Sequence, residues 1–150
     1  MIVVRVQEED FELGQEAQQL TKGRTEIGAL VTFSGLVRDR GEGLKSMTLE
    51  HYPGMTEKAL QAIAEEATQR WSLDACLIIH RYGPMKPGEQ IMMVAAGSAH
   101  RQAAFEAADF MMDYLKSRAP FWKKEDTGET KDWVDARETD EAALSRWTKS

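Results

Sequence analysis

The segment ACLIIHRYGPMKPGEQIMMVAA, residues Ala75–Ala96, decides the fold class of this 150-residue chain. Its two apolar runs, Ala75–Tyr82 and Gln90–Ala96, have the length and composition of buried strands. The glycines and prolines of Gly83–Gly88 predict a turn between them. Two strands therefore follow one another without a helix, whereas a parallel doubly wound sheet needs a helix after each strand. This segment favours an α+β fold.

The flanking sequence repeats the pattern of strands grouped between helices. We expect a helix at Glu57–Trp71, with Thr56 as its N-terminal cap, and a long helix at roughly Ala99–Arg118. The other expected elements are strands at Ile2–Val6, Ile27–Val37, Met47–Tyr52 and around Trp133, and helices at Phe11–Leu20 and Thr139–Trp147. We predict a single α+β domain over residues 1–150, with a mixed, largely antiparallel sheet and a long helix after the central strands.

Composition excludes several classes of function. The chain has 25 acidic and 19 basic side chains, a net charge of -6, which disfavours broad binding to nucleic acid or to an anionic membrane. No apolar run approaches the roughly 20 residues that span a bilayer. The first ten residues, MIVVRVQEED, lack the features of a signal peptide. The single cysteine, Cys76, permits no internal disulfide, which predicts a cytoplasmic protein.

The segment MMDYLKSRAPFWKKE, Met111–Glu125, concentrates positive charge in this acidic chain. A helix cannot run through Pro120, so Lys116 and Lys123 should lie on different elements that can converge. Apolar and cationic neighbours lower the pKa of a lysine and suit it to proton transfer or nucleophilic attack. The alternative is a helix end with cations near the C-terminal dipole, which accounts for Lys116 but not for Lys123. Physical reasoning alone leaves both readings open.

Two further cationic positions are candidates for anion binding. The segment Gly97–Arg101 lies where a strand becomes the long helix, and free N–H groups at a helix start attract anions. Arg101 would add donors for a phosphate or carboxylate. Alternatively Ser98 is only a helix cap and His100 an ordinary first-turn residue, which spacing alone slightly favours. Arg38 ends a predicted strand, where a solvated loop arginine is the commoner interpretation.

No metal or cofactor site is predicted. The three histidines and one cysteine lack metal-ligand spacing. His51 and His80 lie in strand-like segments and are expected to be structural, and Cys76 is expected to be a buried, inert thiol. The glycines that follow the strand at Ile27–Val37 do not open a helix, so the dinucleotide-binding fingerprint fails.

Three segments of the chain resemble one protein family. They read LEHYPGMTEKAL (Leu49–Leu60), SAHR followed by FEA (Ser98–Arg101 and Phe105–Ala107), and MDYLK followed by APFWKKE (Met112–Lys116 and Ala119–Glu125). In this order they are similar to the large, catalytic subunit of molybdopterin synthase. The resemblance covers about Ile27–Trp147.

The resemblance implies an α/β-hammerhead fold and a homodimer. Each large subunit would bind a small ubiquitin-like sulfur carrier, which gives a heterotetramer. The C-terminal Gly-Gly tail of the carrier would bear a thiocarboxylate. Two sulfurs would pass to cyclic pyranopterin monophosphate, forming the dithiolene of molybdopterin. Because the thiocarboxylate already carries activated sulfur, the enzyme would need neither a catalytic cysteine nor a cofactor.

The resemblance also implies roles for the cationic residues. Lys116 would meet the thiocarboxylate, and Lys123 would act beside it as a substrate ligand or proton donor. The substrate-binding residues implied by the resemblance are Arg38, His100, Arg101, Lys124, Glu125 and Arg137. The pocket would draw on the second subunit of the dimer, and Arg137 matches a residue that some relatives supply in this way. Leu36 departs from the pattern, because some relatives have lysine there.

Two alternatives remain at this level. The basic and aromatic segment around Phe121 and Trp122 could hold a nucleotide or single-stranded RNA in a binding module without activity. A chain with this fold could also only scaffold the carrier. The acidic net charge counts against the first alternative, and the three intact motifs count against the second.

Overall fold

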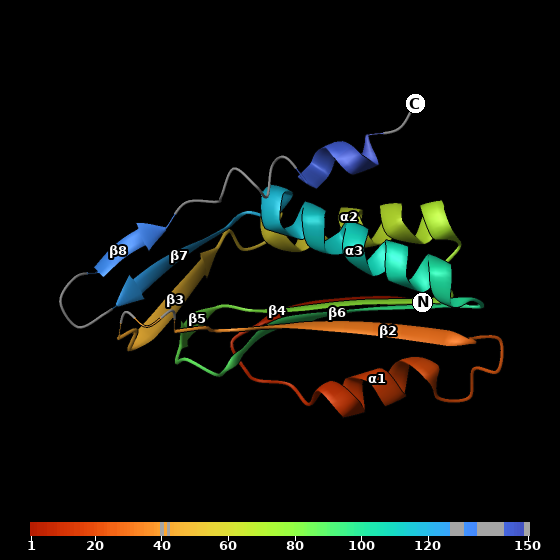
Figure 1. Ribbon diagram of the computed structural model, residues 1–150, viewed down its shortest axis with the longest axis horizontal. Coiled ribbons are helices and arrows are strands. Elements are labelled where there is room, and N and C mark those ends of the chain that lie inside the picture. Colours follow the sequence, from red (N-terminus) through yellow and green to blue (C-terminus); the bar gives the residue numbers. More distant parts are fainter. Residues whose placement is uncertain (40, 42, 127–130, 135–142, 149–150) are drawn as a thin grey trace.

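The computed structural model describes residues 1–39, 41, 43–126, 131–134 and 143–148. In chain order its elements are β1 (Ile2–Gln7), α1 (Leu13–Thr21), β2 (Ala29–Leu36), β3 (Ser46–His51), α2 (Met55–Trp71), β4 (Ala75–Arg81), β5 (Gly83–Met85), β6 (Gln90–Ser98), α3 (Arg101–Arg118), β7 (Phe121–Asp126), β8 (Lys131–Val134) and the 3-10 helix η1 (Leu144–Trp147). In this part of the chain the strands form two sheets, shown in Figure 1. The predicted α+β class is confirmed.

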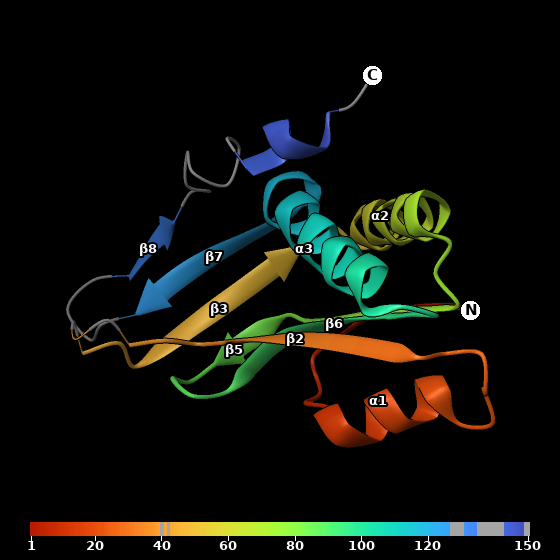
Figure 2. The ribbon, with the colours of Figure 1, turned by 45° about the vertical axis from the view of Figure 1, so that its right-hand side comes forward.

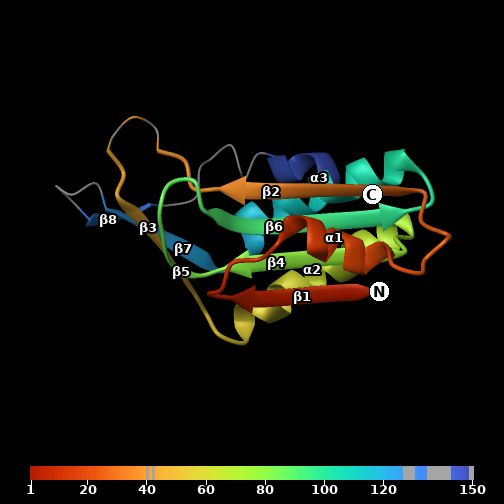
Figure 3. The same cartoon turned by 90° about the horizontal axis from the view of Figure 1, so that it is seen from below.

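The first sheet has the strand order β1-β4-β6-β2. Only β1 and β4 pair in parallel, and the other two pairings are antiparallel, so the prediction of a mixed, largely antiparallel arrangement is confirmed. Helices α2 and α3 cover one face, and α1 lies across the other, as Figure 3 shows. Strand β4 is buried along its whole length because both of its faces are covered.

The second sheet has the order β5-β3-β7-β8 and is antiparallel throughout. Figure 2 shows β3, β7 and β8 beyond one end of the first sheet. Strand β7 was not predicted, because its four charged residues hide the alternation of a strand. It forms through its pairing with β3, in which His51 lies opposite Phe121 and Ser46 lies opposite Asp126.

Alternate residues of β4 enter two different cores. Cys76 and Ile78 pack in the core beneath α2 and α3, whereas Leu77 and Ile79 pack in the core beneath α1. Burial raises the pKa of the Cys76 thiol to about 11, so the thiol stays protonated near neutral pH. This agrees with the prediction of an inert cysteine.

The C-terminal segment differs from the prediction. Residues 143–148 lie over α2 and α3 as a short 3-10 helix, and the α-helix predicted there is wrong for these residues. The Trp147 indole packs edge-on against Phe110 and Trp71, with ring centroids 5.5 and 5.7 Å away. Its Nε1 donates to the Asp113 carboxylate at 2.5 Å. Among the described residues, none of the helices is both long and apolar enough to cross a membrane.

Candidate active site

A tight turn at Pro120 separates the two candidate lysines. Helix α3 ends at Arg118, and the Phe121 N–H donates to the Ala119 carbonyl at 2.9 Å as the chain turns into β7. Lys116 lies exposed in the last turn of α3, and Lys123 lies half-buried in β7. The predicted break at the proline is therefore confirmed, and the two lysines belong to different elements.

Imidazole and aromatic rings gather beside Phe121 at the start of β7. The His80 ring stacks on the Phe121 ring, with centroids 3.7 Å apart. The His51 ring lies 6.3 Å from Phe121 and 4.2 Å from Tyr82. Residues two apart on a strand share a face, so Phe121 and Lys123 face the side of β7 on which His51 also lies. Lys123 therefore belongs to the face that carries this ring cluster.

Lys116 acts on the same cluster through its charge. The pKa of His80 is lowered to about 4, mainly by burial and in smaller part by the positive charge of Lys116 and by the nearby His51, against the opposing effect of the hydrogen bond to the Arg81 carbonyl. A carbonyl can only accept, so His80 Nδ1 carries a proton and donates to the Arg81 carbonyl at 2.9 Å. His80 is consequently neutral near pH 7. The two lysines thus border a neutral, mostly apolar group of rings.

Glu125 and Lys124 lie on opposite faces of the second sheet. Glu125 pairs with Met47 and shares the face of Lys123, whereas Lys124 pairs with Thr48 and faces the other side. Trp122 shares that other face with Lys124, and its ring lies 4.9 Å from the exposed Tyr52. The structure therefore brings Glu125, but not Lys124, onto the face of Lys123.

His100 and Arg101 lie at the far end of α3. Both are exposed, and His100 is the residue that precedes the first helical turn. Ser98 does not occupy that position, although its buried hydroxyl donates to the His100 carbonyl at 2.5 Å and accepts from the His100 N–H at 3.2 Å. At a rise of about 1.5 Å per residue, His100 and Lys116 are roughly 24 Å apart along the helix. One chain alone does not bring them together.

Arg38 lies at the same end of the molecule as Lys116. In the register of β2 with β6, Ala29 lies opposite Ser98 and Leu36 lies opposite Gln90. The exposed Arg38 follows β2 at the end remote from Ser98, which is the end where α3 stops (Figure 1). The predicted site residue Arg137 lies outside the described residues. In the described segments, no group of His, Cys, Asp and Glu side chains could hold a metal ion.

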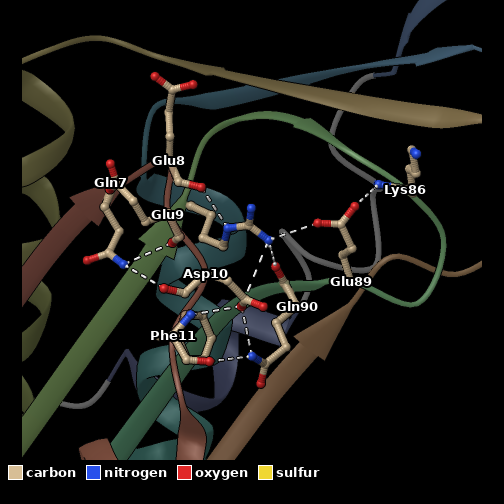
Figure 4. Close-up of polar contacts among 9 residues, drawn as sticks. Gln7, Glu8, Glu9, Asp10, Phe11, Lys86, Glu89 and Gln90 are labelled. Atoms are coloured by element: carbon tan, nitrogen blue, oxygen red, sulfur yellow. Dashed lines mark hydrogen bonds and ion pairs between the residues drawn. The ribbon is translucent and has the colours of Figure 1, made fainter.

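A buried arginine next to His80 was missed by sequence reasoning. Arg81 is 7% exposed, and the residues whose oxygens surround its guanidinium, Glu8, Glu89 and Gln90, are labelled in Figure 4. The guanidinium donates to the carbonyls of Glu8 and Gln90, both at 2.9 Å, and lies 3.5 Å from the Glu89 carboxylate. These bonds hold Arg81 in place, and with it the Arg81 carbonyl that orients His80. The sequence feature that could have identified Arg81 is the position of an arginine at the end of a run of apolar strand residues.

A second missed residue is Thr56. The predicted cap position is wrong, because α2 already begins at Met55. The Thr56 side chain is 0% exposed. Its hydroxyl accepts from the Tyr52 N–H at 3.1 Å and donates to the Pro120 carbonyl at 3.0 Å. The sequence gives no signal for a contact between residues 64 positions apart.

Comparisons with known proteins give one consistent result. Residues 6–118 match the family described as MoaE protein. The chain is 62% identical to the molybdopterin synthase catalytic subunit of Cereibacter sphaeroides over 144 residues, which are 96% of this chain and 99% of that relative. It superposes on the molybdopterin biosynthesis MoaE protein from Burkholderia ambifaria with a TM-score of 0.87, at 51% identity and full coverage of both chains.

A more distant solved structure supports the fold. A chain from a protein-protein complex of subunits 1 and 2 of molybdopterin-converting factor from Helicobacter pylori superposes with a TM-score of 0.74. The match covers 91% of each chain at 17% identity. The same arrangement of sheets and helices therefore persists after most residues have changed.

Proposed function

Because the chain belongs to the MoaE family, the catalytic subunits of molybdopterin synthase in molybdenum cofactor biosynthesis, we propose that it transfers sulfur from a thiocarboxylated carrier protein to cyclic pyranopterin monophosphate. The observation that carries this proposal is the placement of Lys116 and Lys123 around the neutral His80 and Phe121 rings. The whole chain would act as one domain, in the cytoplasm.

Lys116 and Lys123 have separate roles in this proposal. The Lys116 ammonium attracts the thiocarboxylate of the carrier and stabilises negative charge that develops during transfer. Lys123 binds the pterin substrate or donates a proton to it, and Glu125 lies on the same face. In each transfer a carbon–sulfur bond forms to the pterin side chain while a carbon–oxygen bond of that side chain breaks. Water then cleaves the acyl–sulfur bond of the carrier, and its oxygen becomes part of the carrier's C-terminal carboxylate. No protein thiol takes part, which fits the buried Cys76 with its raised pKa.

The phosphate of the substrate requires a further cationic group. Arg38 is available at the Lys116 end of α3, whereas His100 and Arg101 lie roughly 24 Å away along the helix. We therefore assign His100 and Arg101 to the site of a second copy of the chain. In such a homodimer, each site would contain the Lys116 end of α3 from one copy and the His100 end of α3 from the other copy.

The edge of the first sheet supports such a dimer. Strand β2 contains no charged residue and no proline, and it exposes Phe33 at 44% and Leu36 at 53%. Within the described part of the chain no strand pairs with its outer edge. Long uncharged edges favour pairing with another strand. Antiparallel pairing of β2 with its copy would place Ala29 near Leu36 of the other copy, and so direct Arg101 toward the other site.

The carrier is the second proposed partner. The Cereibacter relative is described as a catalytic subunit, and the Helicobacter structure is a complex of subunits 1 and 2. We infer that a small ubiquitin-like protein inserts its Gly-Gly thiocarboxylate tail beside Lys116, one carrier for each copy, in a heterotetramer. Lys124 and Arg137 stay proposed substrate contacts. Lys124 could contact the substrate only from the face of the second sheet opposite to Lys123.

Substitution of Lys116 tests the proposal. Lys116→Ala in the complex with thiocarboxylated carrier should abolish conversion of cyclic pyranopterin monophosphate to molybdopterin without changing the circular dichroism spectrum. Lys22→Ala is a matched control, because Lys22 is exposed at the end of α1 on the opposite face of the first sheet. Substantial activity of the Lys116 variant would overturn the role assigned to this lysine.

A further inference from the structure

The turn Ala119–Phe121 sets the relative position of the two lysines. It is the only covalent link between the last turn of α3, with Lys116, and the start of β7, with Lys123. Both lysine side chains are long and flexible, so their convergence depends on how firmly the backbone between them is held. The contacts made by this turn therefore bear directly on the geometry of the site.

Thr56 contacts this turn from another part of the chain. Its hydroxyl has one proton, which it gives to the Pro120 carbonyl at 3.0 Å, and it accepts the Tyr52 N–H at 3.1 Å. One side chain therefore joins the end of β3, the first turn of α2 and the turn before β7. The Thr56 side chain is fully buried, so its hydroxyl is shielded from water on its own side of these two bonds.

His80 holds the next residue of the same turn. Its ring stacks on Phe121 at 3.7 Å with an angle of 18° between the planes. The Arg81 carbonyl fixes the orientation of that ring through Nδ1. The turn is thus held through the Pro120 carbonyl by a hydrogen bond and through the Phe121 side chain by a stack.

We propose that Thr56 is a positioning residue for the sulfur-transfer reaction: its hydroxyl fixes the Ala119–Phe121 turn so that Lys116 and Lys123 face the same bound substrate. The inference rests on the proposed function of these two lysines. Thr56 does not touch the substrate in this account. Its effect is on geometry, and a displacement of a catalytic group by about 1 Å can cost on the order of a hundredfold in rate.

The test uses the complex with thiocarboxylated carrier and compares Thr56→Val with Thr56→Ser. Valine keeps the shape of threonine but removes both hydrogen bonds, whereas serine keeps the hydroxyl. We expect Thr56→Val to lower kcat about tenfold, with little change in KM for cyclic pyranopterin monophosphate, and Thr56→Ser to restore most of kcat. Hydrogen exchange of a peptide containing Phe121 should be faster in the valine variant only.

Thr68→Val is the matched control in the same helix. The Thr68 hydroxyl is buried near the Cys76 thiol but has no hydrogen-bond partner of normal geometry among the described residues. The same substitution there should leave kcat unchanged. It separates the loss of any buried hydroxyl in α2 from the loss of the bond to Pro120.

The outcomes distinguish this inference from the proposed function. If Lys116→Ala and Lys123→Ala are inactive but Thr56→Val keeps wild-type kcat per folded molecule, the lysine site stands and the role of Thr56 is overturned. If Thr56→Ser is as slow as Thr56→Val, the hydroxyl is not the positioning group, and this holds even when the valine variant folds poorly. If the lysine variants stay active, both proposals fall together.

Discussion

The His80 imidazole lies 3.7 Å from the Phe121 ring, nearly parallel to it, at the junction between the two sheets. His80 is the last residue but one of the buried strand β4, and Phe121 begins β7. The stack therefore joins the first sheet to the strand that carries Lys123. It also forces His80 into a buried, uncharged state beside a lysine, and this state has a measurable consequence.

We expect His80 to make the folded protein less stable as the pH falls from 6.5 to 4. The pKa of His80 is about 4 in the folded chain and near 6.5 in the unfolded chain, because burial and Lys116 disfavour its charge. Between these values the unfolded state binds more protons, so acid favours unfolding. The loss should amount to about 3 kcal/mol. Urea unfolding of wild type and His80→Phe at both pH values measures it.

His80→Phe keeps an aromatic ring against Phe121 but cannot titrate. The two proteins share all other groups, so the carboxylates that also titrate in this range cancel in the comparison. A wild-type protein that loses no more stability than His80→Phe between pH 6.5 and 4 would show that His80 is not held neutral.

The Cys76 thiol should resist modification in the folded protein. It is 0% exposed, and burial raises its pKa to about 11, so almost no thiolate is present at pH 8. With a chromogenic disulfide reagent at pH 8, we expect release of the chromophore only at the rate of unfolding, and a fast reaction in urea. A fast reaction of the native protein would contradict the buried position of this side chain.

The packing of residues 143–148 against α2 and α3 should depend on Trp147 far more than on Arg146. The Trp147 indole contacts Phe110 and Trp71, so Trp147→Ala should cost about 3 kcal/mol of unfolding free energy. Arg146 pairs with Asp109 and Asp113, but its side chain is 51% exposed, and Arg146→Ala should cost less than about 1 kcal/mol. Denaturant unfolding of both variants gives the comparison. Equal losses would show that the Arg146 ion pairs hold this segment as strongly as the indole does, against the prediction.

Sequence patterns predicted the elements that bury a continuous apolar surface. Ala75–Ala96 was predicted as two adjacent strands because its residues are apolar enough to be covered on both faces. Strand β7 was missed because its stability comes from pairing with β3, whose partner residues lie 70 (His51 to Phe121) to 80 (Ser46 to Asp126) positions earlier in the chain and leave no periodic signal. Tertiary pairing overrode the local composition there.

The sequence also predicted only part of the candidate site. Pro120 signalled that Lys116 and Lys123 lie on separate elements, and this is observed. The placement of Lys124 on the opposite face of β7 could not be predicted without the strand itself. The long predicted helix already implied that His100 and Lys116 are far apart, because helix length follows from residue number alone.

This separation leads to a prediction about mixed dimers. If each site combines Lys116 of one copy with Arg101 of the other, a dimer of one Lys116→Ala chain and one Arg101→Ala chain retains one intact site. Two affinity tags allow purification of that mixed dimer after co-expression. With thiocarboxylated carrier, it should show about half of the wild-type activity, whereas each variant homodimer should be nearly inactive.

A second mixed dimer provides the control, and its outcome follows from the same geometry. Lys116 and Lys123 flank one turn in one chain, so a dimer of Lys116→Ala with Lys123→Ala has one defect in each site and should stay inactive. Recovery in this second dimer would mean that the two lysines serve different sites, against the convergence argued from His80 and Phe121. Absence of recovery in the first dimer would place Arg101 outside the site of the other copy. The pair of measurements therefore decides which residues each copy contributes.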